Sequence, residues 1–149
     1  MSDLRIEPAA DDAAMEDWRH VHNTIIPTVA LSLEEVRERV GRHLLEVAYA
    51  DDLLVGCSTV RPPAGEAAVA TVIARVLAEH RRQGFGRELY ERGLARARDQ
   101  AAEVIETIVL ASNEDGLRFA LAHGFVEVER YLLPGDEVPF VTLRLHESA

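Results

Sequence analysis

The hydrophobic residues recur at helical spacing in some segments and form alternating or continuous runs in others. The first pattern is typical of amphipathic helices, and the second is typical of strands buried on one or both faces. The chain therefore predicts a mixed α/β fold in which helices separate groups of strands. The expected strands are residues 4–8, 43–50, 53–61, 67–78, 106–111, 125–133 and 140–145.

Two helices are expected before most of these strands. Asp11 or Asp12 can cap the first helix, because a short acidic side chain accepts hydrogen bonds from the free amides of a helix start. Trp18 lies on the apolar stripe of this helix. Ser32 and Glu35 have the spacing of a capping box in front of the second helix.

The middle of the chain predicts a compact group of strands. The connection Asp51-Asp52 is short enough to make a hairpin between the strands on either side of it. A Pro-Pro-Ala-Gly turn is expected at 62–65, followed by the apolar run 67–78. So many consecutive β-branched and apolar residues predict a central strand that is covered on both faces.

A helix from Phe85 to about Glu103 separates that central strand from the strand 106–111. Strand, helix and strand in this order predict a right-handed crossover between parallel neighbours. A capping box at Ser112 and Asp115 is expected to start the last helix, before the two terminal strands.

Composition excludes several kinds of chemistry. All sixteen basic residues are arginine, so the chain has no Walker-type phosphate lysine, no Schiff-base lysine and no lysine general base. The formal net charge of −10 at pH 7 argues against a nucleic-acid partner. The 149 residues fit one domain, predicted to span 1–149.

The cysteine and histidine content points to a protein without disulfides or bound metal. Cys57 has no partner for an internal disulfide and lies in an apolar strand, where it is interpreted as core packing. The six histidines lack the spacing of a zinc site. No membrane span or export signal is read in the sequence, so a cytoplasmic protein without membrane partners is expected.

The stretch HRRQGFG, residues 80–86, joins the central strand to the long helix. A helix start presents unpaired N–H groups and the positive end of the helix dipole, which together attract anions. Gly84 and Gly86 allow a ligand to approach the backbone closely, because glycine has no Cβ. The dinucleotide fingerprint fails because Leu89 stands where it needs glycine, and the P-loop fails for want of lysine.

The remaining pattern is Arg-x-x-Gly-x-Gly, formed by Arg81, Gly84 and Gly86. It resembles the acetyl-CoA signature of the Gcn5-related N-acetyltransferase (GNAT) superfamily. The stretch NEDGLRFALAHGF, from Asn113 to Phe125, also resembles the Asn-led helix and Gly-Phe ending of that family. The resemblance covers nearly the whole chain and implies a mixed, mostly antiparallel sheet of six to seven strands. It also implies a parallel crossover at the CoA-binding strand and helices on both faces.

The resemblance further implies acetyl-CoA as acyl donor. The loop amides from Arg82 to Arg87 would surround the pyrophosphate, and a bulge in the preceding strand would open a gap for pantetheine beside Val76 and Ala78. Asn113 would contact the pantetheine or a nearby water, or else act as a helix cap. The residues predicted to hold the cofactor are Val76, Leu77, Ala78, Arg81, Arg82, Gln83, Gly84, Phe85, Gly86, Arg87 and Asn113.

Two catalytic groups found in many members of that family are missing. The stretch 71–75 has no glutamate to act as general base, and Ala120 replaces the tyrosine that protonates the departing sulfur. The candidate catalytic residues are Tyr131, Asn113 and His80, and for Tyr131 a packing role on its strand is the alternative. At pH 7 an amine with a pKa near 10.4 is neutral in only about one molecule in two thousand, so a weakly basic amine is favoured.

Two functions are compatible with these residues. The first is an N-acetyltransferase that passes acetyl directly from acetyl-CoA to a primary amine of a small molecule or peptide. The second is a catalytically weak or inactive acyl-CoA-binding sensor of the same fold, because a fold does not fix a function. A homodimer is common in the family that the chain resembles.

Overall fold

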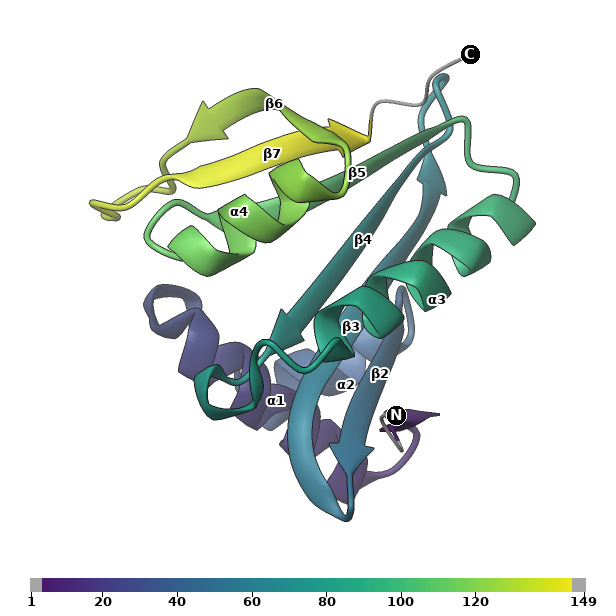
Figure 1. Ribbon diagram of the computed structural model, residues 1–149, viewed down its shortest axis with the longest axis vertical. Helices are drawn as coiled ribbons and strands as arrows, with labels where there is room; N and C mark the ends of the chain where they lie inside the picture. Colours follow the sequence, from purple (N-terminus) through teal and green to yellow (C-terminus); the bar gives the residue numbers. More distant parts are fainter. Residues whose placement is uncertain (1–3, 146–149) are drawn as a thin grey trace.

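The seven strands found within residues 4–145 join one sheet in the order β1-β2-β3-β4-β5-β7-β6 (Figure 1). A computed structural model of the chain describes residues 4–145. The elements are β1 (Leu4–Pro8), α1 (Asp12–Ile25), η1 (Pro27–Val29), α2 (Leu33–Val40), β2 (Leu44–Ala50), β3 (Leu53–Ala64), β4 (Val69–Val76), η2 (Ala78–His80), α3 (Phe85–Asp99), β5 (Val104–Leu110), α4 (Glu114–Ala122), β6 (Phe125–Tyr131) and β7 (Phe140–Leu145).

The sheet is mostly antiparallel, with one parallel pair. Strands β1 to β4 pair with their sequence neighbours in antiparallel fashion. Helix α3 then crosses over, and β5 lies parallel to β4. Strand β7 inserts between β5 and β6 and is antiparallel to both. The predicted mixed fold with a parallel crossover is confirmed.

Helices cover both faces of the sheet, as expected. Helix α1 begins at Asp11, whose side chain accepts a hydrogen bond from the Ala14 amide, and the predicted capping box of α2 is present. The indole of Trp18 donates to the Ser58 carbonyl oxygen at 3.1 Å and anchors α1 to β3. On the other face, Arg92 of α3 makes two hydrogen bonds to the buried carboxylate of Glu46 on β2. These contacts fix α1 and α3 on opposite sides of the same strands.

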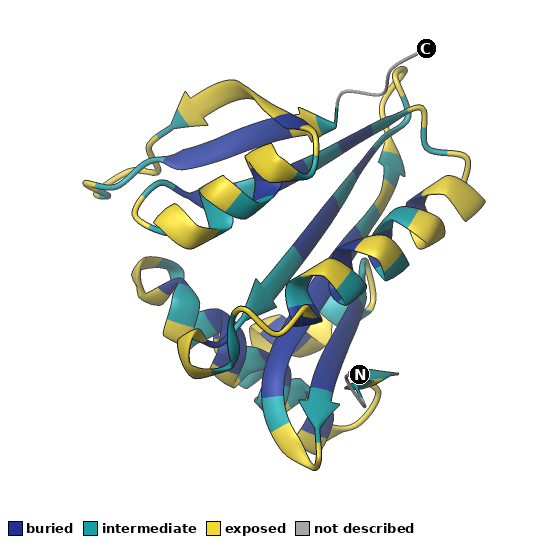
Figure 2. Cartoon of the chain, in the orientation of Figure 1, coloured by how far each residue is buried: buried dark blue, intermediate teal, exposed yellow. Residues whose placement is uncertain are grey.

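The core is divided by the sheet into layers. Under α1 and α2, Trp18 and Val36 pack with Val47 and Cys57, and burial raises the pKa of the Cys57 thiol to about 12. This supports the interpretation of Cys57 as core packing. Figure 2 shows that the inner strands are largely buried, whereas β6 at the sheet edge is mostly exposed.

Several predicted boundaries are wrong. Strand β3 continues through the two prolines to Ala64, and the turn follows at 65–68. An irregular register between Arg61 and Ala64 accommodates the prolines, which cannot donate to a regular ladder. Helix α3 ends at Asp99 rather than Glu103. Ala101 adopts a left-handed backbone with φ 63°, which a continuing helix does not allow.

The start of α4 also differs from the prediction. Asn113, not Ser112, is the N-cap, and its side-chain oxygen accepts a hydrogen bond from the Gly116 amide at 3.1 Å. Asparagine is among the best N-cap residues, and the helix begins one residue later than the capping box implied. The last turn of the helix is followed by Gly124 with φ 92°, a left-handed stop typical of glycine.

His22 is a buried histidine whose ring stacks on Trp18 with centroids 5.2 Å apart. Burial, followed by the nearby Arg75 cation, lowers its pKa from 6.5 to about 4. The unfolded chain therefore takes up a proton on this ring near pH 6.5, while the folded chain resists it until about pH 4. Protonation of His22 in the unfolded chain therefore lowers the free energy of unfolding as the pH falls from about 6.5 to about 4.

We predict that the free energy of unfolding of His22→Gln falls less than that of the wild type when the pH is lowered. Between pH 7 and pH 5 the histidine should cost the wild type about 2 kcal/mol of unfolding free energy, which the variant does not lose. Urea denaturation of both proteins at the two pH values measures the difference. Parallel pH dependence of the two proteins would contradict a neutral, buried His22.

Candidate active site

The turn between β4 and α3 carries a helix start without a side-chain cap. Gly84 is the N-cap of α3, with φ 85°, and in the described part of the chain no side chain caps this helix start. Arg82 also has a left-handed backbone, with φ 64°. The chain thus curls immediately before the helix, and the amides of its first turn remain free. Such a helix end favours a bound anion.

Next to this turn the sheet opens between its two parallel strands. Strand β4 pairs with β5 only from Val69 to Thr71, although it continues to Val76. Figure 1 shows the two strands diverging beyond the paired end. Pairing of β4 with β3 is regular from 71 to 76, so the expected bulge is absent from that ladder. The gap arises because β4 and β5 separate.

The backbone of Val76 faces this gap. The Leu77 amide donates to the Val55 carbonyl oxygen of β3 at 2.9 Å. Neighbouring residues in a strand direct their polar groups to opposite sides, so the N–H and C=O of Val76 point away from β3. The Val76 carbonyl accepts a hydrogen bond from Arg81 Nε at 2.9 Å. An extended ligand lying in the gap can pair with this residue like an added strand.

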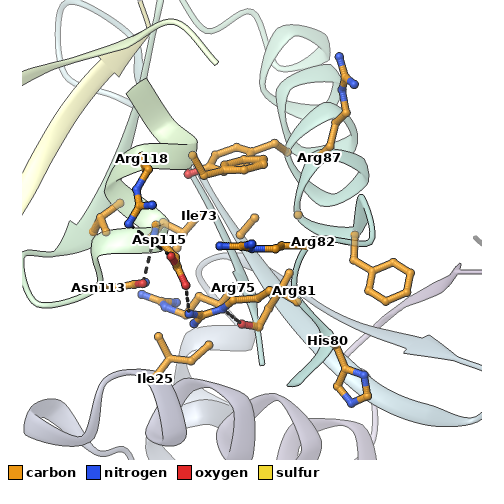
Figure 3. A pocket seen from close by; sticks show the side chains of 18 of the residues that line it. Ile25, Ile73, Arg75, His80, Arg81, Arg82, Arg87, Asn113, Asp115 and Arg118 are labelled. Carbon is orange, nitrogen blue, oxygen red and sulfur yellow. Dashed lines mark hydrogen bonds and ion pairs between the residues drawn. The ribbon is translucent and has the colours of Figure 1, made fainter. Parts of the chain in front are cut away.

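A cavity of about 410 Å³ joins the turn to the gap. Its volume is typical of a site for a small ligand or part of a cofactor. Figure 3 shows Arg82, Arg87 and His80 on one side of it, with Asn113 and Arg118 of α4 on another. The predicted site residues that line it are Val76, His80, Arg81, Arg82, Gly84, Phe85, Gly86, Arg87 and Asn113.

Four predicted site residues lie outside this lining. Leu77 is buried in the core that contains Trp18, so its side chain has no access to the cavity. Ala78 belongs to the short helix η2, and Gln83 is exposed on the turn. Tyr131 stacks on Phe140 with centroids 5.8 Å apart, in a hydrophobic cluster whose members Ile26 and Leu110 line the cavity although Tyr131 does not. The packing alternative for Tyr131 therefore agrees with its position.

The two glycines of the turn are required for different reasons. The left-handed φ of Gly84 disfavours any residue with a Cβ, although nothing lies within 4 Å of that position. At Gly86 the backbone is helical, and a Cβ would lie 3.6 Å from the Phe119 ring and 3.7 Å from Val76. The protein itself has room for that atom. A longer side chain at Gly86 would extend into the cavity.

Arg81 links the turn to α4. Besides its bond to Val76, its guanidinium lies 3.1 Å from the Asp115 carboxylate, which is also 3.6 Å from Arg118. Asn113 lines the cavity with its side-chain oxygen committed to capping α4. The predicted role of Asn113 as a cap is thus present, and its contact with a cofactor remains a prediction.

Tyr90 and Arg75 are among the cavity residues that were not predicted from the sequence. Tyr90 is nearly fully buried, stacks on Phe119 at 5.1 Å, and shares a hydrogen bond of 2.9 Å with the Thr107 hydroxyl. Burial raises the pKa of Tyr90. Arg75, from β4, lines the cavity from the face covered by α1. The spacing of Tyr90, four residues after Gly86 on one helical face, was the available signal.

Residues 8–125 match the sequence model of the acetyltransferase (GNAT) family. The chain belongs to the GNAT family of acetyltransferases. No curated protein matches the sequence closely enough to be reported as a relative. Its GNAT membership is therefore established by the family model over most of the chain.

Solved structures show the same fold at low sequence identity. A protein provisionally assigned as a phosphinothricin N-acetyltransferase has a TM-score of 0.79 at 18% identity, covering 99% of this chain and 100% of its own. Ribosomal-protein-alanine N-acetyltransferase from Brucella melitensis has 0.71 at 19%, covering 94% and 98%. A GNAT acetyltransferase from Elizabethkingia anophelis, solved with acetyl-CoA bound, has 0.71 at 16%, covering 99% and 100%.

Two further observations concern classes of partner. Within residues 4–145, no three histidine, cysteine or acidic side chains gather in a way that would hold a metal ion. None of the helices in the same part of the chain is long and apolar enough to cross a membrane.

Proposed function

We propose that this protein transfers an acetyl group from acetyl-CoA directly to a primary amine of a small molecule or peptide. The observation that carries the proposal is the uncapped start of α3, which opens into a cavity continuous with the gap between β4 and β5. In a GNAT acetyltransferase, both parts of that arrangement suit one elongated cofactor that carries a diphosphate.

The residues present fit acetyl-CoA. The free amides from Arg82 to Arg87 would hold its diphosphate, and the missing Cβ of Gly86 leaves room for it. The N–H and C=O of Val76 would pair with pantetheine after Arg81 releases the carbonyl. When bound, acetyl-CoA supplies a thioester carbonyl as electrophile, and a backbone N–H directed at its oxygen typically contributes about 10²–10³ in rate.

Deprotonation of the acceptor is the step with least help from side chains. From Thr71 to Arg75 the strand offers no carboxylate that could remove a proton from the amine. The departing thiolate also lacks an acid at position 120, because Ala120 is fully buried and has no acidic proton. Arg75 lines the cavity. A cation near a bound ammonium group lowers the pKa of that group and so favours the neutral, reactive amine.

We predict a characteristic pH dependence for the transfer. The value of kcat/KM should rise about tenfold per pH unit up to the pKa of the free amine, because only the neutral amine reacts. The value of kcat should level off at lower pH, since Arg75 lowers the pKa of the bound amine. In Arg75→Gln the pH at which kcat levels off should rise toward the pKa of the free amine.

CoA release measured from pH 6 to 10 tests this expectation, with amines of differing pKa as acceptors. A value of kcat/KM that does not vary below pH 8 would contradict it and would point to a general base on the enzyme. Unchanged acetyl-CoA affinity in Arg75→Gln serves as the control, since Arg75 is not among the residues proposed to hold the cofactor.

The second candidate is an acyl-CoA-binding sensor of the same fold. The missing glutamate and the alanine at position 120 favour it. Calorimetry with acetyl-CoA, followed by CoA release across an amine panel, separates the two. Binding with turnover supports the transferase, whereas binding with no turnover for any amine supports the sensor.

A further inference from the structure

Three partly buried arginines differ from most others in this acidic chain because they lack a carboxylate partner. Arg39, Arg61 and Arg75 are each only partly accessible. Within residues 4–145, carboxylates form ion pairs with many of the other arginines but with none of these three. In a protein with ten more negative than positive formal charges, this local excess of positive charge is unusual.

The three side chains come from neighbouring elements on one face of the sheet. Arg75 on β4 is opposite Cys57 on β3, and Arg61 lies four residues further along β3. Residues an even number apart point to the same face, so Arg61 and Arg75 share the face of Cys57, about 13 Å apart along the strands. Cys57 packs under α1 and α2, so this is the face that those helices cover.

Arg39 reaches the same region from α2. Of the other arginines, Arg61 lowers the pKa of Arg39 most, whereas Glu35 and Glu38 raise it, and Arg39 in turn lowers the pKa of Arg75. Ile73 lies on β4 between the levels of the two strand arginines and lines the cavity. The arginines therefore extend from the cavity wall at Arg75 toward the end of α2.

This arrangement is costly without an anion. Burial is the main cause that lowers the pKa of each of the three guanidinium groups, and repulsion by neighbouring arginines adds to it, with Arg42 as the repelling cation for Arg61. Arg61 Nε is buried without a hydrogen-bond partner in the described part of the chain, and so is Nδ1 of the adjacent His43. Buried donors and charges left unpaired destabilise a protein unless a ligand pairs with them.

We propose that Arg39, Arg61 and Arg75 form the subsite for an acidic group on the acceptor, which is then a primary amine that also carries a carboxylate or phosphonate. The inference rests on the proposed function and names the class of its substrate. With the acid group on the guanidinium groups, the amine end of such a molecule reaches the cavity beside Ile73. Arginine suits this role because its planar fork of donors pairs with two anionic oxygens.

The test compares ω-amino acids with alkylamines of matched length. The probes are β-alanine, 4-aminobutyrate, 5-aminopentanoate and 3-aminopropylphosphonate, each paired with the alkylamine that lacks the acid group. Binding to the CoA-saturated protein is measured by calorimetry, and acetylation is measured by CoA release at saturating acetyl-CoA. We expect at least one acid to bind and react about tenfold better than its alkylamine, the value of one good charged hydrogen bond or more.

The variants are Arg61→Gln, Arg39→Gln and Arg75→Gln, with the exposed Arg96→Gln as matched control. The preference for acids should fall to about onefold in the first two, and remain in the control. Arg61→Gln and Arg39→Gln decide the question, because Arg75 is also proposed to lower the pKa of the bound amine and its loss alters the rate with both kinds of acceptor. Retention of acetyl-CoA affinity in all of them separates this subsite from the cofactor site.

The two readouts distinguish the inference from the function on which it rests. Equal binding of acids and alkylamines, or an acid preference that survives Arg61→Gln and Arg39→Gln, overturns the subsite. Arginine-dependent binding of acids without acetylation supports the subsite and overturns the transferase. Acetylation of alkylamines alone supports the transferase and overturns the subsite.

Discussion

We expect the affinity for acetyl-CoA to fall by about 100-fold or more when Gly86 is replaced by glutamate, while the fold is retained. The Cβ at this position meets only ordinary contacts with Phe119 and Val76, so the protein tolerates the backbone change. The rest of the side chain extends into the cavity at the start of α3. There it brings a negative charge to the site proposed for the diphosphate, and blocks the space.

Calorimetry with acetyl-CoA measures the loss, and circular dichroism with urea denaturation checks the fold. The control is Ala95→Glu, which adds the same charge to the exposed side of the same helix. Its affinity should stay within about twofold of the wild type, because exposed charges beyond about 10 Å are screened at ordinary ionic strength. Unchanged affinity in Gly86→Glu would refute the assignment of this loop to the diphosphate.

Replacing Gly56 with alanine should lower the free energy of unfolding by about 2–3 kcal/mol, the upper range for overpacking a core position. Gly56 lies on β3 opposite Val76, and a Cβ there would lie 2.4 Å from the Arg75 carbonyl oxygen. That atom belongs to the backbone of β4 and cannot rotate away. The two strands would have to separate at the edge of the cavity.

Gly86→Ala is the matched control for this change. Both variants add one methyl group to a buried or partly buried glycine, but at Gly86 the new contacts are 3.6 Å or longer. Alanine also favours a helix by up to about 1 kcal/mol relative to glycine, so this control should be as stable as the wild type or more stable. Equal urea midpoints for the two variants would contradict the close approach of β3 and β4 at Gly56.

Much of the fold follows from local patterns. The capping box at Ser32 and the hairpin at Asp51-Asp52 are properties of a few adjacent residues, so the sequence predicts them correctly. The parallel crossover follows from the order of strand, helix and strand. The predicted ends of elements are wrong where they depend on pairing with another strand, as at the two prolines of β3, which lie beside β4.

The site was predictable in its backbone and much less in its side chains. The glycine turn lies at a helix start, so its anion-binding geometry follows from local structure. The cavity wall is different, because it forms where α1, β4, α3 and α4 meet. Tyr90 lies on α3 and Arg75 on β4, and the separation of β4 from β5 gives both access to the cavity.

The most direct test of the account is a crystal structure of the protein with acetyl-CoA. We predict that the diphosphate oxygens lie within hydrogen-bond distance of amides between Arg82 and Arg87, and that pantetheine pairs with the Val76 backbone in the gap between β4 and β5. A cofactor bound elsewhere on the protein, or a loop closed over its own amides by its own side chains, would contradict this account.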